Sequence, residues 1–598
     1  MNRAMPCTLL LLLVLAAPAA VAHSEKEPMK NMETTKLNAL IDEEWAWGLN
    51  EYPTAGTYLG EPGYNDRWPD LAASAYERRR KHALDVLTRI KAIDRSKLPK
   101  ADQLNYDLFR RDVELDIAGQ RFPEELIPIN QMGGIHQDVA DLMLYSPHES
   151  VKDFDDALKR LRALPRQVDQ TIDLMRRGME KGLTPPRVTL RNVREAIDSQ
   201  IVEDPTKSPI YEQAFGKFPD SISKTEQDRI RTQAQGAIRE SVVPAYRKLA
   251  KFWNEEYEPR TRTTVGASDL PDGKAWYEWR IKQMTTTDLT ADQIHEIGLS
   301  EVKRIRAEME RVKDQTGFKG DLGAFFKFLR TDPQFYFDKK EELLTAYRDI
   351  AKRIDPELPR LFGTLPRQTY GVLPVPAYSE KNQTTAYYSP GSIEAGRPGY
   401  FYANTYDLKS RPKWEMEALT VHEAVPGHHL QIARAQELGE LPKFRRNAFY
   451  TAYVEGWGLY SESLGPELGL YKDPYSKFGQ LTYEMWRAIR LVVDTGIHSK
   501  GWTREQAINF FKDNAGKAEH DITVEIDRYI VWPAQALAYK LGELKIKELR
   551  AFATRELGDR FEIRKFHDVV LGAGPLPLSI LETRVKEWVA EVKAKKAA

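Results

Sequence analysis

The sequence contains a single cysteine, Cys7, among 598 residues. Cys7 lies at the start of an apolar run at 8–17, which is preceded by the basic Arg3 and followed by small residues up to Ala22. This pattern is typical of a secretory signal peptide and is too short for a stable membrane span. Cleavage after Ala22 leaves a chain without cysteine, which excludes disulfides, thiol catalysis and cysteine-ligated zinc.

The signal peptide at 1–22 predicts a periplasmic or secreted protein. In exported lipoproteins the lipid-carrying cysteine follows the apolar run, whereas Cys7 precedes it. We therefore expect a soluble mature chain with no membrane attachment after cleavage.

The sequence also lacks net charge, because 88 Lys and Arg residues balance 88 Asp and Glu residues. This balance gives no electrostatic reason to expect a nucleic-acid or anionic-membrane partner. Hydrophobic residues make up 41% and charged residues 29%, as in globular proteins with a sizeable core. The oligomeric state cannot be read from these features.

Most of the chain has the three- and four-residue hydrophobic spacing of helices. Thr290 with Gln293 and Thr503 with Gln506 form two capping-box patterns, which mark helix starts. One proline- and glycine-rich region, 365–410, contains an aromatic stretch at 399–405 that reads as a short strand. We predict a mostly α protein of two lobes, a helical lobe at 23–365 and a catalytic lobe at 366–598.

Three histidines fall within eight residues, at His422, His428 and His429, and Glu423 follows the first. Zinc peptidase helices carry a His-Glu pair with a second histidine four residues after the first. Here the separation is six or seven residues. Six residues of regular helix turn the second side chain about 120° away, and seven place it about 10 Å further along the axis.

Pro426 removes this difficulty, because its ring clashes with the carbonyl of His422 and it has no N–H to donate. Gly427 can adopt whatever backbone angles an opened helix needs. We predict a local bulge that brings His428 to the usual ligand position.

Glu455 lies in a second apolar helix at 449–464, where a buried carboxylate is unfavourable unless it is paired or bound to metal. Two histidines and one glutamate leave a fourth position open, as in catalytic zinc sites. We predict one Zn²⁺ ion held by His422, His428 and Glu455, with Glu423 as the general base. A chance histidine cluster and a structural Glu455 remain the alternatives.

The motifs at 422–431, 453–457 and 526–530, together with 387–390, 397–399, 493–498 and 533–539, resemble the DUF885 family of bacterial proteins. That family is similar to the helical gluzincin peptidases, which include angiotensin-converting enzyme, thimet oligopeptidase and the Taq-type carboxypeptidases. The resemblance implies a two-lobed helical fold with a deep cleft, zinc on the cleft floor and a small β element nearby. The six-residue histidine spacing departs from those peptidases.

The resemblance also implies roles for further residues. In those peptidases a glycine directly precedes the second zinc histidine, which favours His428 over His429. Arg528 and Tyr529 resemble an Arg-Tyr pair whose tyrosine donates a hydrogen bond to the tetrahedral intermediate, with Tyr539 as a weaker second candidate. His498 and His520 compete for the remaining electrophilic role, and His498 is preferred. The strand at 399–405, with Tyr402 and Asn404, resembles the edge strand that binds an extended substrate.

These features predict a zinc-dependent metallopeptidase acting on short or unfolded peptides. Two alternatives stay open: a zinc hydrolase of non-peptide amides or esters, and an inactive peptide-binding protein that keeps the fold. The sequence does not distinguish exopeptidase from endopeptidase action.

Overall fold

The computed structural model describes residues 31–376, 380, 384–393, 396–439 and 441–595. The predicted signal peptide at 1–22 and Cys7 lie outside the described residues. Within the described ranges, no helix is long and apolar enough to cross a membrane. The mostly α prediction is confirmed, because helices account for nearly all regular structure and the described residues form one small sheet.

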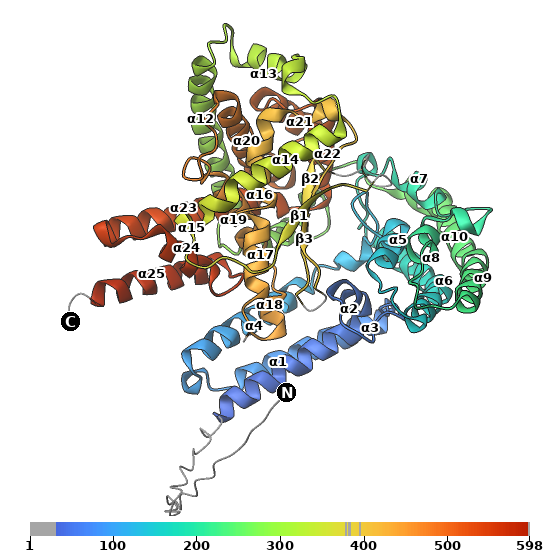
Figure 1. Cartoon of the computed structure of the whole chain (residues 1–598). Helices are drawn as coiled ribbons and strands as arrows, with labels where there is room; N and C mark the ends of the chain where they lie inside the picture. The colour runs from blue at the N-terminus through green and yellow to red at the C-terminus, as the bar shows by residue number, and fades with distance from the viewer. Residues whose placement is uncertain (1–30, 377–379, 381–383, 394–395, 440, 596–598) are drawn as a thin grey trace, which may run out of the picture.

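The first helices form a layer along the lower edge of Figure 1. The three long helices among them, at 32–51, 73–91 and 100–119, share one hydrophobic core that includes Leu40, Ile90 and Phe109. The helices are α1 (Met32–Glu51), α2 (Pro53–Leu59), α3 (Ala73–Lys91) and α4 (Lys100–Gly119).

A second group of helices forms a body with its own core, drawn in cyan and green in Figure 1. This core contains buried residues between 129 and 257 and none from outside that range. The helices are α5 (Ile135–Tyr145), α6 (Val151–Glu180), α7 (Val193–Asp198), α8 (Pro209–Phe215), α9 (Lys224–Ala237) and α10 (Val243–Phe252).

The remaining helices include two closely packed pairs, 291–315 with 474–499 and 451–462 with 538–557. Both predicted capping boxes are present, at the starts of α12 and α21. The helices are α11 (Gly273–Thr285), α12 (Ala291–Gln315), α13 (Leu322–Thr331), α14 (Lys340–Ile354), α15 (Leu358–Leu361), α16 (Met416–Glu423), α17 (His428–Gln436), α18 (Lys443–Arg446), α19 (Thr451–Glu462), α20 (Pro474–Ser499), α21 (Arg504–Asn514), α22 (Glu519–Val531), α23 (Ala538–Leu557), α24 (Ile563–Leu571) and α25 (Leu578–Ala594).

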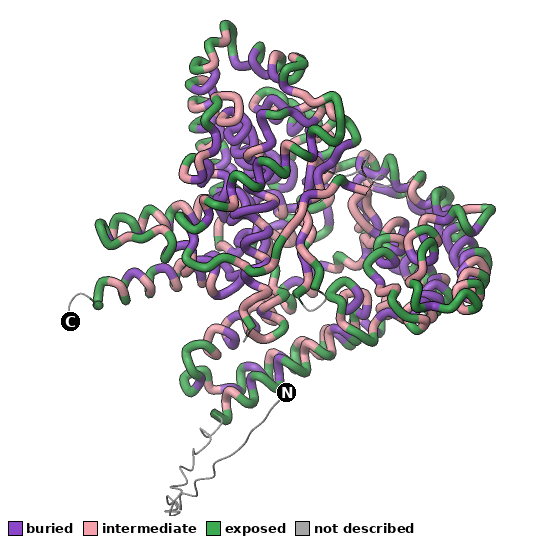
Figure 2. The backbone as a smooth tube through the Cα atoms, viewed as in Figure 1, coloured by how far each residue is buried: buried purple, intermediate pink, exposed green. Residues whose placement is uncertain are grey.

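The hydrophobic cores do not separate at residue 365. Helices α12 and α13 share a core with α20 to α22, and α14 shares another with α16, α19 and α23. Figure 2 shows the buried backbone concentrated where these helices meet. The body at 129–257 therefore has a core of its own, whereas the two-lobe boundary and the deep cleft stay predictions.

The sheet has the strand order β1-β3-β2, with β1 (Tyr370–Pro374), β2 (Ala386–Ser389) and β3 (Gly399–Ala403). Strand β3 pairs in parallel with β1 and antiparallel with β2. The predicted strand is present, but the prediction that it lies at the sheet edge is wrong. Because both sides of β3 are hydrogen-bonded to neighbours, an added strand could pair with β1 or β2 but not with β3.

Candidate metal centre

The chain breaks between α16 and α17, where a bulge was predicted. Helix α16 ends at Glu423, and α17 begins at His428 after a cis Val425–Pro426 peptide bond. The Gly427 N–H donates to the carbonyl of Val421 at 3.0 Å, which folds the connection back over the end of α16. A Cβ atom on Gly427 would lie 2.0 Å from the carbonyl oxygen of His422, so only glycine fits this approach.

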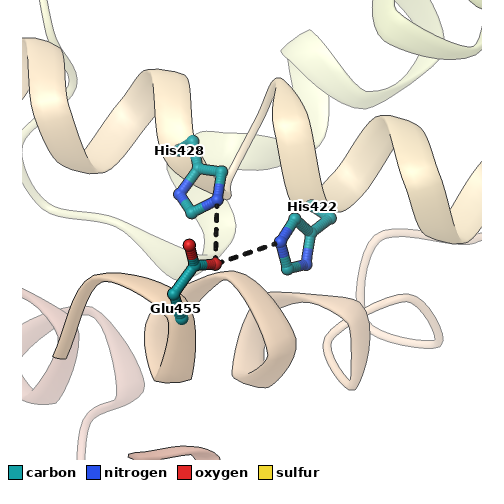
Figure 3. Close-up of side chains that lie close together, drawn as sticks. All are labelled: His422, His428 and Glu455. Carbon is teal, nitrogen blue, oxygen red and sulfur yellow. Dashed lines mark ion pairs between the residues drawn. The ribbon is translucent and has the colours of Figure 1, made fainter. Parts of the chain in front are cut away.

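This break brings His428 beside His422, and their ring centroids lie 4.8 Å apart. The Nε2 atoms of His422 and His428 lie 3.8 Å and 3.5 Å from the same oxygen, Oε2 of Glu455. One ligand atom from each of the three residues lies within 4.8 Å of the others. Figure 3 shows both imidazoles reaching toward the carboxylate from separate helices.

Two glycines position α19, the helix that carries Glu455. A Cβ atom on Gly456 would lie 2.5 Å from the backbone of Gly542, so α19 and α23 cross in close contact. A Cβ atom on Gly458 would lie 2.8 Å from the ring of His422, so this glycine leaves room for the imidazole. The small residues beside Glu455 therefore set the depth at which its carboxylate meets the histidines.

Glu462 is a member of the site that the sequence reasoning missed. Its Oε1 lies 2.8 Å from Nδ1 of His422, and its side chain is fully buried. The Arg487 guanidinium, 3.5 Å from the same oxygen, partly balances this buried charge. Glu462 follows Glu455 by seven residues, which places both carboxylates on one face of α19. This spacing is the sequence feature that could have indicated Glu462.

The two carboxylates strongly affect the pKa of His422. Burial alone would lower the pKa of His422, but its contacts with Glu455 and Glu462 raise that pKa to about 9. Burial would raise the pKa of Glu455, yet the contacts with His422 and His428 hold it well below its usual value. The three side chains therefore attract one another even without a bound ion.

Glu423 is the last residue of α16 and is partly exposed. Its carboxylate forms no hydrogen bond or ion pair with the described residues. Glu423 directly follows His422 in the sequence. A carboxylate without a partner among the described residues therefore lies next to the three-residue cluster.

His429 has a different environment from His428. Its Nδ1 lies 2.9 Å from the hydroxyl of Tyr388 on β2, and its Nε2 lies 3.1 Å from the carbonyl oxygen of Gln368. Both ring nitrogens are thus engaged away from Glu455. The geometry selects His428, as predicted, as the second histidine of the cluster.

Tyr529 lies in a buried polar network. Its hydroxyl donates to Glu525 at 2.6 Å and accepts from Arg490 at 2.9 Å and from Trp486 at 3.0 Å. The side chain is 1% exposed. The single hydroxyl proton is committed to Glu525, so the predicted bond to a reaction intermediate would require this contact to break.

Arg528 and Tyr539 belong to the same network. The Arg528 guanidinium donates to Gln535 at 2.7 Å and to the Tyr539 hydroxyl at 3.2 Å. The Arg490 guanidinium lies 4.3 Å from the centre of the Tyr539 ring. These contacts hold α20, α22 and α23 together, and a substrate-binding role for Arg528 or Tyr539 stays a prediction.

His498 and His520 do not join the three-residue cluster. Nδ1 of His498 accepts from the backbone N–H of Ala267 at 2.9 Å, and its Nε2 lies 2.9 Å from the carbonyl oxygen of Tyr529. Burial lowers the pKa of His498 to about 3, so the ring is neutral and bonded at both nitrogens. His520 is exposed near the start of α22. An electrophilic role would require His498 to give up one of these bonds.

Tyr402 and Asn404 are part of the sheet region. The Tyr402 ring stacks on Tyr387 of β2, with ring centroids 5.0 Å apart. The buried Asn404 amide donates to the carbonyls of Glu380 and Thr384 at 2.7 Å and 3.1 Å. Asn404 therefore supports the local backbone, whereas the Tyr402 side chain is partly exposed.

Comparison with known proteins places this arrangement in a family. The sequence model of a family described as "Bacterial protein of unknown function (DUF885)" matches residues 53–585. The chain belongs to the DUF885 family. No match was found among curated proteins.

Solved structures support the fold of this DUF885 protein. A "putative lipoprotein" from Colwellia psychrerythraea is 30% identical with a TM-score of 0.87, over 94% of this chain and 99% of that chain. A "putative lipoprotein of unknown function" from Shewanella oneidensis is 17% identical with a TM-score of 0.68, over 92% and 99% of the two chains. The second likeness shows the fold alone. Neither description gives an activity, and a shared fold does not define a function, which depends on the residues of the site.

Proposed function

We propose that this DUF885 protein is an exported zinc-dependent hydrolase that cleaves peptide bonds. The observation that carries the proposal is the meeting of His422, His428 and Glu455 despite the six-residue histidine spacing. The predicted signal peptide supports export, as do the solved relatives described as lipoproteins.

The donor set fits zinc. Tetrahedral zinc with ligand bonds of about 2.0–2.2 Å separates its ligand atoms by roughly 3.4 Å, close to the 3.5 Å and 3.8 Å between Glu455 and the two histidines. Glu462 holds Nδ1 of His422, which would leave the Nε2 atom available to bind the ion. Two histidines and one carboxylate are a common ligand set of catalytic zinc sites.

A bound zinc ion would supply a Lewis acid that polarises the scissile carbonyl and activates water. Glu423 would accept a proton from the attacking water and return it to the leaving amine nitrogen. Its partly exposed carboxylate, which has no ion pair among the described residues, suits this transfer better than one fixed by an ion pair. Glu462 and Arg487 would keep His422 in one orientation throughout.

The sheet favours a peptide as the substrate. Strand β2 pairs with β3 alone in the described sheet and packs against α16, the helix that carries His422 and Glu423. An extended peptide added to an edge strand is held by main-chain hydrogen bonds whatever its side chains. The substrate-binding edge strand, predicted to be β3, would therefore be β2. The resemblance to the gluzincin peptidases also supports a peptide substrate.

The first experiment measures zinc in the purified mature chain by elemental analysis, beside His428→Ala and Glu455→Ala. About one zinc per chain, lost in both variants, is expected from a three-ligand site. The second experiment tests a panel of peptides, amides and esters with Glu423→Gln as the matched variant. Loss of the general base is expected to lower kcat by about 10²–10⁴-fold while zinc stays bound.

Absence of zinc after its addition would contradict the proposal and favour a binding protein that keeps the fold. If only esters or non-peptide amides are cleaved, the result would support a zinc hydrolase but contradict a peptide substrate.

A further inference from the structure

A second candidate site lies in a cavity among α2, α5 and α6. Its volume is about 210 Å³, and Figure 1 places these helices together in the blue and cyan part of the molecule. Tyr58, Trp68, Val139 and Leu142 supply apolar and aromatic walls. Sites for drug-sized ligands have volumes of about 300–1,000 Å³, so this cavity suits a smaller molecule.

Asp138 is the charged side chain of the cavity wall. Both of its carboxylate oxygens accept from the backbone N–H of Gly134 at 3.1 Å, and it forms no ion pair with the described residues. Lysine, arginine and histidine are absent from the lining residues. Desolvation of the carboxylate raises the pKa of Asp138 to about 6, the hydrogen bond from Gly134 opposes this rise, and the charge of Asp141 adds to it. Asp138 is exposed to solvent, so the cavity offers a carboxylate that forms no ion pair with the described residues and is accessible to a cationic ligand.

Gln167 of α6 offers a second polar group to the same cavity. The residue is 7% exposed, and its side-chain amide forms no hydrogen bond with the described residues. The amide atoms themselves are not fully buried, so they are accessible to a ligand in the cavity. Its carbonyl oxygen can accept a hydrogen bond from an ammonium group, as the Asp138 carboxylate can.

We infer that this cavity binds a small primary amine in its ammonium form, with an apolar or aromatic body. The ammonium group would donate to Asp138 and Gln167, and the body would lie against Tyr58 and Trp68, whose ring faces also attract cations. A free amine and the amino terminus of a peptide share this chemistry. The site is independent of the histidine cluster and of the function proposed for it.

Isothermal titration calorimetry at pH 7.5 tests the inference with 2-phenylethylamine as the probe. The uncharged 2-phenylethanol is the ligand control and is expected to bind at least tenfold more weakly. Asp138→Asn keeps an acceptor for Gly134 but removes the charge, and is expected to weaken amine binding at least tenfold. Asp141→Asn, on the same helix but outside the cavity wall, is the matched variant and is expected to change binding less than threefold.

The two sources of the amine are distinguished with phenylalanyl-glycinamide beside 2-phenylethylamine, both titrated into His428→Ala. This variant also keeps peptide hydrolysis from disturbing the measurement. Binding of either probe, lost in Asp138→Asn, supports the site, and the tighter probe identifies the source. Failure of both probes to bind at millimolar concentration would overturn the inference, as would equal binding of 2-phenylethanol or unchanged binding by Asp138→Asn.

Discussion

At the scale of single residues, the candidate metal centre depends on which atoms hold each imidazole. His422 lies between two carboxylates, Glu455 at its Nε2 and Glu462 at its Nδ1. The residue types and spacing predicted His422, His428 and Glu455. For Glu462 the seven-residue spacing from Glu455 gave only the shared helix face, and the packing of α16 against α19 is what shows its contact with His422.

The role of Glu462 predicts a graded loss of metal affinity. Glu462→Gln keeps an acceptor for the Nδ1–H of His422 but removes its charge, whereas Glu462→Ala removes both. We expect zinc affinity to fall about tenfold in the first variant and up to about 100-fold in the second, as for other residues that orient zinc ligands. Competition with a coloured chelator measures both constants. Equal affinities in the two variants and the unmodified chain would contradict this role.

The neighbouring histidines predict opposite results. His428→Ala is expected to abolish stoichiometric zinc binding. His429→Ala is expected to retain zinc, because the His429 nitrogens face Tyr388 and Gln368. It should instead lower the free energy of unfolding by about 1–3 kcal/mol, because buried partners lose their hydrogen bonds. Zinc analysis and urea unfolding of the pair test this, and the reverse pattern would move the ligand to His429.

At the scale of elements, the helix break is what makes the cluster possible. The ring of Pro426 and the missing side chain of Gly427 predicted that α16 could not continue regularly. They did not predict how far the chain turns. That turn is set by the N–H groups of Gly427 and His429, which donate to carbonyls six and five residues back, respectively. The order of the sheet was equally out of reach, because β1 and β3 pair across almost thirty residues of sequence.

The break predicts that Gly427 cannot be replaced. In Gly427→Ala the new methyl group would meet the carbonyls of His422 and Val421 at 2.0 Å and 2.4 Å, so α17 must shift. We expect zinc affinity to fall at least tenfold, because the shift moves His428 away from Glu455. Gly439→Ala is the matched control, because nothing described lies within 4 Å of its new Cβ. A crystal structure of Gly427→Ala with His428 in place would contradict the argument.

At the scale of the whole molecule, several histidines are structural. His498 and His567 are buried with both ring nitrogens hydrogen-bonded, and burial lowers the pKa of each to about 3. His136 and His429 are also buried, and burial lowers their pKa values to about 4. The sequence marks His422 by its motif, but it could not show that a histidine such as His498 is structural, because core and functional histidines can have similar apolar neighbours.

These four histidines predict the direction of the pH dependence of stability. Below pH 6.5 the unfolded chain binds protons on histidines that stay neutral in the folded protein, so stability falls as the pH decreases from about 6.5 to 4. Each histidine contributes a slope of up to about 1.4 kcal/mol per pH unit. His567→Gln should therefore reduce the slope by about one histidine's share, whatever it does to stability at pH 7. His520→Gln replaces an exposed histidine and should leave the slope unchanged. Urea denaturation at pH 7, 6 and 5 gives the slope for the unmodified chain and for both variants. An unchanged slope in His567→Gln would show that other groups take up the protons.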